Sequence, residues 1–182
     1  EFRRMLFRSL NEILEAPVVV EESKQAIELN GFNNNIQFDN VQFAYNDTVI
    51  LNQINLTIPK GKTIALVGSS GAGKSTLADL VPRFHDVSGG QLLIDGKNIK
   101  DYSLNSLRKH ISIVTQEPIL FNDTIAANIA LGKPDATMEE IKEAARIANA
   151  YDFIVKKEQG FDTMIGDRGS KLSGGERQRL TI

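Results

Sequence analysis

The chain has 182 residues, of which 41% are hydrophobic and 24% are charged, and its formal net charge is -2 at pH 7. This length can hold one sizeable core, the slightly acidic balance offers no basic face for nucleic acid, and the absence of cysteine excludes disulfide frameworks and thiolate metal sites. No apolar run approaches the length that spans a bilayer and no signal-peptide pattern is present, so the chain as given is expected to be soluble.

The first sixteen residues place apolar side chains at helical spacing with arginines between them, and Pro17 ends the pattern. This pattern predicts an amphipathic helix, which is either a surface helix packed on its own domain or a linker arriving from another domain. Residues 17–35 are polar, acidic and rich in asparagine, as linkers tend to be, and they favour a domain boundary here.

Strand patterns follow this segment. Residues 36–45 (IQFDNVQFAY) alternate apolar and polar side chains with one slip that suggests a β-bulge, and residues 54–58 (INLTI) continue the strand character after a turn at Asn46 and Asp47. Residues 63–68 (TIALVG) form an apolar run with no polar face, which predicts a strand buried on both sides of a mostly parallel sheet.

The remaining elements alternate between helix and strand. Their order predicts an α/β fold whose front part is an antiparallel β-rich region. The expected elements are a helix at 74–82, a strand at 91–94 (QLLI), a helical turn near 103–109, a strand at 111–115 (ISIVT), and helices near 123–130 and 137–149.

The sequence GSSGAGKST at 68–76 fits the phosphate-loop pattern G-x-x-x-x-G-K-[ST]. A predicted strand leads into the loop and a predicted helix follows it, so backbone N–H groups and a helix N-terminus can surround an anion. Lys74 would reach the β- and γ-phosphates of a nucleotide, and the Ser75 hydroxyl would coordinate Mg²⁺. The predicted nucleotide-binding residues of this loop are Gly68, Ser69, Ser70, Gly71, Ala72, Gly73, Lys74, Ser75 and Thr76.

A second glycine motif, LSGGE at 172–176, is followed by the basic run RQR. Together with the phosphate loop, this stretch resembles the signature of the ATP-binding cassette (ABC) proteins. The resemblance implies that Ser173, Gly174, Gly175 and Glu176 form a helix N-terminus facing the γ-phosphate of ATP held by a second copy in a head-to-tail dimer. Glu176 stands where the signature commonly has glutamine, and it puts a negative charge near this anion site.

The resemblance extends to two further positions. Gln116, after the expected strand at 111–115, looks like the glutamine that contacts Mg²⁺ and the attacking water and senses the transmembrane partner. Tyr45 resembles the aromatic residue that stacks on adenine, a role that suits a tyrosine ring. The implied cofactors are ATP and Mg²⁺, and Lys74 and Gln116 are the implied catalytic contacts.

Two segments narrow the resemblance to the nucleotide-binding domains of bacterial lipid A exporters and multidrug half-transporters. Residues 120–129 (LFNDTIAANI) are similar to the segment after the glutamine, and residues 164–175 (MIGDRGSKLSGG) are similar to the loop before the signature. Residues 1–30 then look like a linker from a transmembrane domain, and residues 31–182 like the ATP-binding domain. The implied partners are that membrane domain and a second copy, at the cytoplasmic face of the cell membrane, with no nucleic acid.

The fold expected from the resemblance is a P-loop NTPase core of the ABC type, with an antiparallel β subdomain, a helical subdomain, and the C-terminal part of the core missing. The Walker B carboxylates, the D-loop and the switch histidine that follow the signature in this family are not among the 182 residues. His85 and His110 lie before the signature and cannot replace that histidine. The isolated chain is therefore expected to bind ATP but to hydrolyse it negligibly.

Two alternatives to an exporter ATPase domain remain open at this point. One is a non-catalytic nucleotide-binding module in which ATP only stabilises a dimer. The other is a soluble ABC ATPase acting on DNA or ribosomes, for which the acidic net charge gives no support.

Overall fold

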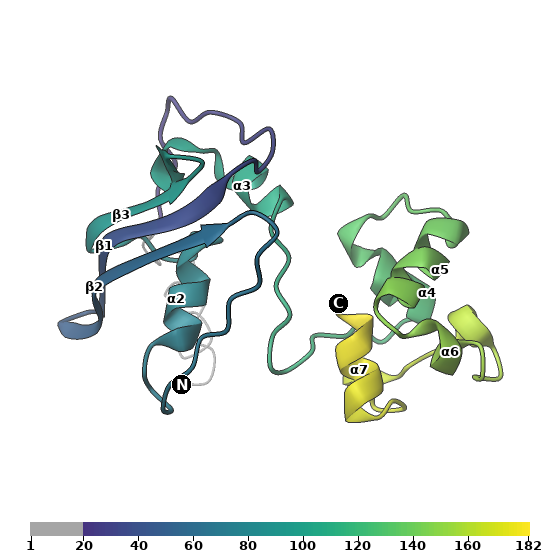
Figure 1. Ribbon diagram of the computed structural model, residues 1–182. Helices are drawn as coiled ribbons and strands as arrows, with labels where there is room; N and C mark the ends of the chain where they lie inside the picture. The colour runs from purple at the N-terminus through teal and green to yellow at the C-terminus, as the bar shows by residue number, and fades with distance from the viewer. Residues whose placement is uncertain (1–19) are drawn as a thin grey trace, which may run out of the picture. The chain divides into compact units, whose positions relative to one another are not determined.

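The computed structural model describes residues 20–182 (Figure 1). The amphipathic helix predicted at 1–16 lies outside the described residues, and the domain boundary predicted at residue 30 stays a prediction. The chain divides into two compact units, Glu1–Ser112 and Ile113–Ile182, each with its own hydrophobic core. Within residues 20–182, no helix combines the length and the apolar character needed to cross a membrane.

The first unit is built on a four-stranded sheet in the order β2-β1-β3-β4, and all of its pairings are antiparallel. The hairpin of β1 and β2 has register shifts between Phe38 and Val41 and again up to Ala44, which confirms the predicted bulge. The strands are β1 (Asn35–Tyr45), β2 (Thr48–Pro59), β3 (Gly89–Ile94) and β4 (Lys97–Asn98).

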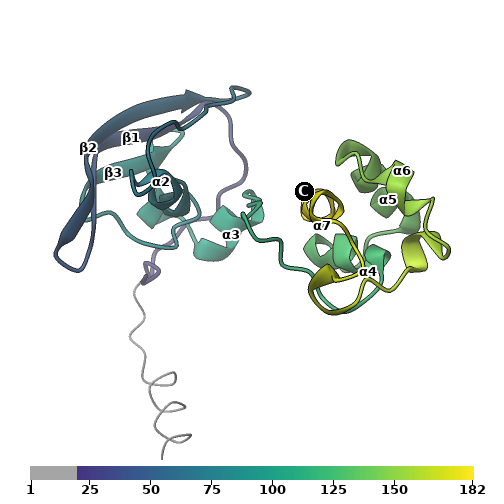
Figure 2. The same ribbon diagram turned by 90° about the horizontal axis from the view of Figure 1, so that it is seen from below.

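Helix α2 (Lys74–Leu80) packs on one face of this sheet (Figure 2). Its buried Leu77 and Leu80 are three residues apart and so lie on one side of the helix. They share a core with buried side chains of the sheet, among them Phe38, Val41, Phe43, Leu51 and Leu92. After β4 come the 3₁₀ turn η1 (Ile99–Asp101) and helix α3 (Leu104–Lys109), whose N-cap Ser103 accepts a hydrogen bond from the Ser106 N–H.

Two predicted strands do not form. Residues 63–68 and 111–115 carry no strand, and the side chains of Ile64, Val67 and Val114 are exposed. A strand buried on both faces needs hydrogen-bonded neighbours, and none of the strands in residues 20–182 pairs with either segment. The strands predicted from the apolar composition of these two segments are therefore wrong. The described sheet is antiparallel and not mostly parallel.

The segment before β1 is held against the first unit by hydrogen bonds. The Ile27 N–H donates to the Asp101 carbonyl at 2.9 Å, and the buried Leu29 donates to the Ser106 hydroxyl at 2.9 Å. Where the segment enters β1, the Asp95 carboxylate accepts backbone N–H groups from residues 33–35 at 2.7 to 3.1 Å. Residues 27–35 are therefore structurally part of the sheet unit.

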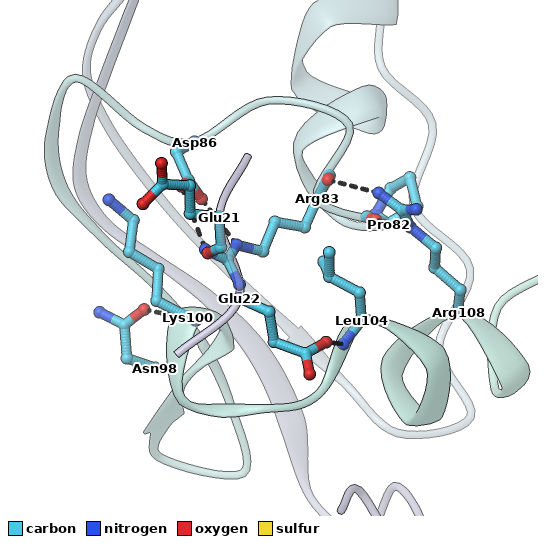
Figure 3. Close-up of polar contacts among 9 residues, drawn as sticks. All are labelled: Glu21, Glu22, Pro82, Arg83, Asp86, Asn98, Lys100, Leu104 and Arg108. Atoms are coloured by element: carbon cyan, nitrogen blue, oxygen red, sulfur yellow. Dashed lines mark hydrogen bonds and ion pairs between the residues drawn. The ribbon is translucent and has the colours of Figure 1, made fainter. Parts of the chain in front are cut away.

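Arg83, just after α2, is the most deeply buried charged side chain of the described residues, with 2% of its surface exposed. Its guanidinium forms a two-pronged ion pair with the Asp86 carboxylate at 2.7 and 3.1 Å and donates to the Glu21 carbonyl at 2.8 Å (Figure 3). Arg108 of α3 in turn donates to the Pro82 and Arg83 carbonyls. The turn after α2 is thus tied to both α3 and the N-terminal segment.

The second unit is helical. Its longest helix, α5, is capped by Thr137, which forms a capping box with Glu140, and its Ile141 and Ala145 are buried at i, i+4 spacing. The helices are α4 (Ile125–Ile129), α5 (Met138–Ile147), α6 (Tyr151–Ile154) and α7 (Gly174–Leu180), joined by the 3₁₀ turns η2 (Ala130–Gly132), η3 (Gly160–Asp162) and η4 (Asp167–Gly169).

We expect Asp86→Ala to lower the free energy of unfolding of the first unit by on the order of 3 kcal/mol, because it leaves the buried Arg83 guanidinium without its carboxylate. The measurement is a urea titration followed on the NMR cross-peaks of β1 and β3. The matched control is Glu143→Ala, which breaks the exposed ion pair with Arg146 and should change the second unit by less than about 0.5 kcal/mol. Equal effects of the two substitutions would contradict the buried role of Arg83.

Candidate functional site

The glycine-rich loop at 68–76 runs directly into α2, as predicted. Gly71 and Gly73 have φ values of 81° and 80°, in the left-handed region that favours glycine. The Lys74 ammonium folds back over the loop and donates to the carbonyls of Gly68 at 3.0 Å and Ser69 at 2.7 Å. No side chain caps the first turn of α2, so its N–H groups are left for another acceptor.

The loop is seated on the β1–β2 hairpin through Gly73. A Cβ atom at this position would lie 2.9 Å from the Leu51 side chain and 3.1 Å from that of Ile50, both on β2. Glycine is therefore required here by close packing as well as by its backbone angle. The close packing of Gly73 on β2 therefore fixes the position at which α2 begins, with Lys74 and Ser75 in its first turn.

Tyr45 lies at the end of β1, opposite Thr48 of β2 and so close in the hairpin to the residues that Gly73 contacts. Its side chain is 42% exposed, and its ring stands edge to face on the buried Phe43 at 4.8 Å between centroids. The hairpin end thus presents an accessible aromatic ring on the same unit as the phosphate loop.

Gln116 belongs to the second unit and is exposed, in a bend and not at the end of a strand. The local backbone is shaped by the Thr115 hydroxyl, which donates to the Glu117 carbonyl at 2.6 Å. The predicted strand placement of Gln116 is therefore wrong, because the preceding residues 111–115 have no pairing partner among the described strands.

The LSGGE stretch begins α7, as the sequence indicated. Ser173 is the N-cap: its hydroxyl accepts the Glu176 N–H at 3.3 Å, and its own N–H donates to the Glu176 carboxylate at 2.7 Å, which is a capping box. Gly174 and Gly175 are exposed, and among the described residues no hydrogen-bond acceptor is found for their N–H groups. The helix start therefore offers backbone donors at the two glycines.

The carboxylate of Glu176 is engaged on both sides. Besides the Ser173 N–H, it pairs with the Lys157 ammonium at 3.0 Å. The pKa of Glu176 is lowered to about 2, mainly by the backbone hydrogen bond from Ser173, then by the Ser173 side chain and the Lys157 ammonium, against the opposing effect of burial. The negative charge that the sequence places beside the glycines is thus balanced by a lysine.

The predicted site residues fall on both units. The first unit carries Tyr45 and the loop 68–76, and the second carries Gln116 and the stretch 173–176. Ser75 and Gln116 both offer oxygen donors of the kind that Mg²⁺ prefers. Across residues 20–182, no group of three or more His, Asp or Glu side chains is arranged as a metal site.

Two residues beside the site were not identified from the sequence. Lys157 lies nineteen positions before Glu176 and belongs to the turn after α6, so no local pattern links the two. His85 packs its ring against Tyr45 at 5.3 Å, although forty residues separate them. Only the fold of each unit brings these pairs together.

Comparison with known proteins identifies the family. The family model for ABC transporters matches residues 51–182. A bacterial Atm1-family ABC exporter with ATP bound has the same fold, with a TM-score of 0.89 and 41% identity over 98% of this chain and 32% of that one. The chain belongs to the ABC transporter family and has an ABC-type NTPase core with an antiparallel sheet and helices.

The chain is similar to parts of longer exporters. It is 55% identical to an ATP-dependent lipid A-core flippase of Syntrophus aciditrophicus over 91% of this chain and 28% of that protein. It is 58% identical to a putative multidrug export ATP-binding/permease protein of Staphylococcus aureus over 81% of this chain and 26% of that protein. The chain thus spans about a quarter of the length of these relatives.

The capping box of α7 gives a pH prediction. Because the pKa of Glu176 is about 2 in the folded chain and near 4.5 as the ordinary value, its stabilising effect is complete above about pH 5 and is lost as the pH falls toward 2. We expect Glu176→Ala to cost roughly 1 kcal/mol at pH 7 and much less near pH 2, measured by urea unfolding of the second unit.

The control is Glu176→Gln, whose side-chain carbonyl still accepts the Ser173 N–H, so the helix start persists while this pH dependence disappears. A carboxyl titration of Glu176 by carbon NMR with a midpoint at or above 4.5 would contradict the capping geometry.

Proposed function

We propose that this chain is the ATP-binding part of an ABC exporter that couples ATP binding and hydrolysis to export of a lipid or other hydrophobic substrate. The observation that carries the proposal is the phosphate loop, in which left-handed glycines, Lys74 and an uncapped helix start converge. The similarity to a lipid A-core flippase and a multidrug export protein supports the exporter class.

In this proposal the nucleotide phosphates bind at residues 68–76. The uncapped N–H groups at the start of α2 donate to phosphate oxygens, and the helix end favours negative charge. Lys74 exchanges its bonds to the Gly68 and Ser69 carbonyls for the β- and γ-phosphates. The ammonium is already positioned over the loop, so little reorganisation is needed.

Ser75 on the first unit and Gln116 on the second would each offer an oxygen ligand to Mg²⁺. The ion would neutralise charge that develops on the transferred phosphoryl group. Tyr45 would stack on the adenine base through its exposed face, as aromatic rings do with bases. These assignments use oxygen donors and a ring that are accessible on the two units.

The signature stretch would act on a second copy of the domain. The N–H groups of Gly174 and Gly175 are the available donors, and they would contact the γ-phosphate of ATP bound to that copy in a head-to-tail dimer. The transmembrane domain of the whole protein would be the other partner, which places this domain at the cytoplasmic face of the membrane, the inner membrane in a bacterium. Neither partnership involves nucleic acid.

Lys74→Ala should weaken ATP binding by about ten- to a hundredfold, because charge-assisted hydrogen bonds to the phosphates are lost. Isothermal titration calorimetry with MgATP gives the affinity. Lys97→Ala, which removes an exposed lysine in β4, is the matched control and should leave the affinity unchanged. Equal affinities of Lys74→Ala and the unsubstituted chain would refute the phosphate-loop assignment.

The 182-residue polypeptide taken alone should bind ATP without appreciable turnover, because Asp95, the carboxylate that directly follows the apolar strand β3, is engaged by the backbone N–H groups of residues 33–35 and is not available to polarise water. Phosphate release measured with excess MgATP should stay at the level seen with Lys74→Ala. A steady release that Lys74→Ala abolishes would show that the polypeptide is an active ATPase by itself.

A further inference from the structure

Three aromatic rings meet at the C-terminal end of β1. Phe43 and Tyr45 are two residues apart on the strand, and His85 comes from the segment between α2 and β3. The His85 ring stands at 89° to the Tyr45 ring with 5.3 Å between centroids, and lies 5.4 Å from the ring of Phe43. Phe43 is 5% exposed and Tyr45 is 42% exposed, so the cluster runs from the core to the surface.

The position of His85 is fixed from both sides. On one side, Arg83 and Asp86 form the buried ion pair that holds the turn after α2. On the other side, the Ser88 N–H donates to the Gln42 carbonyl at 2.8 Å, and the Ser88 hydroxyl accepts the Ala44 N–H at 3.3 Å. The segment carrying His85 is therefore pinned to β1 beside Tyr45, and the ring contact is not that of a free surface side chain.

We propose that His85 is a positioning residue for the adenine base, acting through Tyr45. With Phe43 and His85 against it, the Tyr45 ring is confined to one orientation and keeps one accessible region for stacking. A ring already fixed in its binding orientation loses less conformational entropy when the base arrives. This inference rests on the proposed binding of ATP. It adds a residue that affects binding of the adenine base, through Tyr45, and does not affect binding of the phosphates.

The ring contact predicts a selective effect. His85→Ala frees the Tyr45 ring and should weaken ATP binding about fivefold, the effect of one edge-to-face aromatic contact. Inorganic tripolyphosphate has no base, so its affinity should not change. His85→Phe keeps a ring of similar size against Tyr45 and should restore ATP affinity to within about twofold of the original.

The test is calorimetry of the 182-residue chain and its variants with MgATP and with magnesium tripolyphosphate, joined to a double-mutant cycle with Tyr45→Ala. If His85 acts through Tyr45, then His85→Ala has no further effect once Tyr45 is alanine. Additive losses, an unchanged ATP affinity in His85→Ala, or a parallel loss of tripolyphosphate affinity would each overturn the inference.

Failure of the underlying function gives a different pattern. If the unsubstituted chain binds neither ATP nor tripolyphosphate, both proposals fall together, whereas normal binding of both ligands by His85→Ala removes only the role of His85. Folding of each variant is checked by the NMR signals of the first unit. The chain has two histidines and three tyrosines, so the ring resonances of His85 and Tyr45 can be followed directly.

Discussion

The buried ion pair of Arg83 and Asp86 is the constraint on which the first unit depends. It lies just after α2, a helix of seven residues with a rise of about 10 Å whose other end begins at the phosphate loop. The same guanidinium holds the Glu21 carbonyl, and the segment it fixes carries His85 to Tyr45. A single buried guanidinium thus joins the turn after α2 to the N-terminal segment and holds the stretch that carries His85.

Much of the local structure follows from the sequence. The hairpin with its bulge, the helix after the GK of the phosphate loop, and the N-cap at Ser173 all depend on neighbouring residues, and each forms as the pattern indicates. Capping and turn formation depend on residues close together in the chain, so they can be predicted from the sequence. The ABC family follows in the same way from two glycine motifs at a characteristic separation.

The predictions from the sequence are wrong or incomplete where the structure depends on residues that lie far apart in the chain. The apolar run at 63–68 predicts a buried strand, but a strand exists only when another backbone pairs with it. Similarly, the sequence places a negative charge at Glu176 beside the glycines, but nothing in the local sequence shows that Lys157 reaches it from the turn after α6. His85 beside Tyr45 is a third case, since the contact is created by the packing of β1 against the segment that follows α2.

The pairing of Glu176 with Lys157 also bears on how a nucleotide would approach the start of α7. Because Lys157 balances the Glu176 carboxylate, the other charged groups beside the exposed glycine N–H groups are guanidinium groups: a Cβ at Gly174 would lie 4.0 Å from Arg177 Nη2, and one at Gly175 would lie 3.6 Å from Arg179 Nη1. The attraction between these positive groups and a phosphate extends over about the Debye length, which shortens as salt is added. The rate at which a phosphate docks on this helix end would therefore fall as the ionic strength rises.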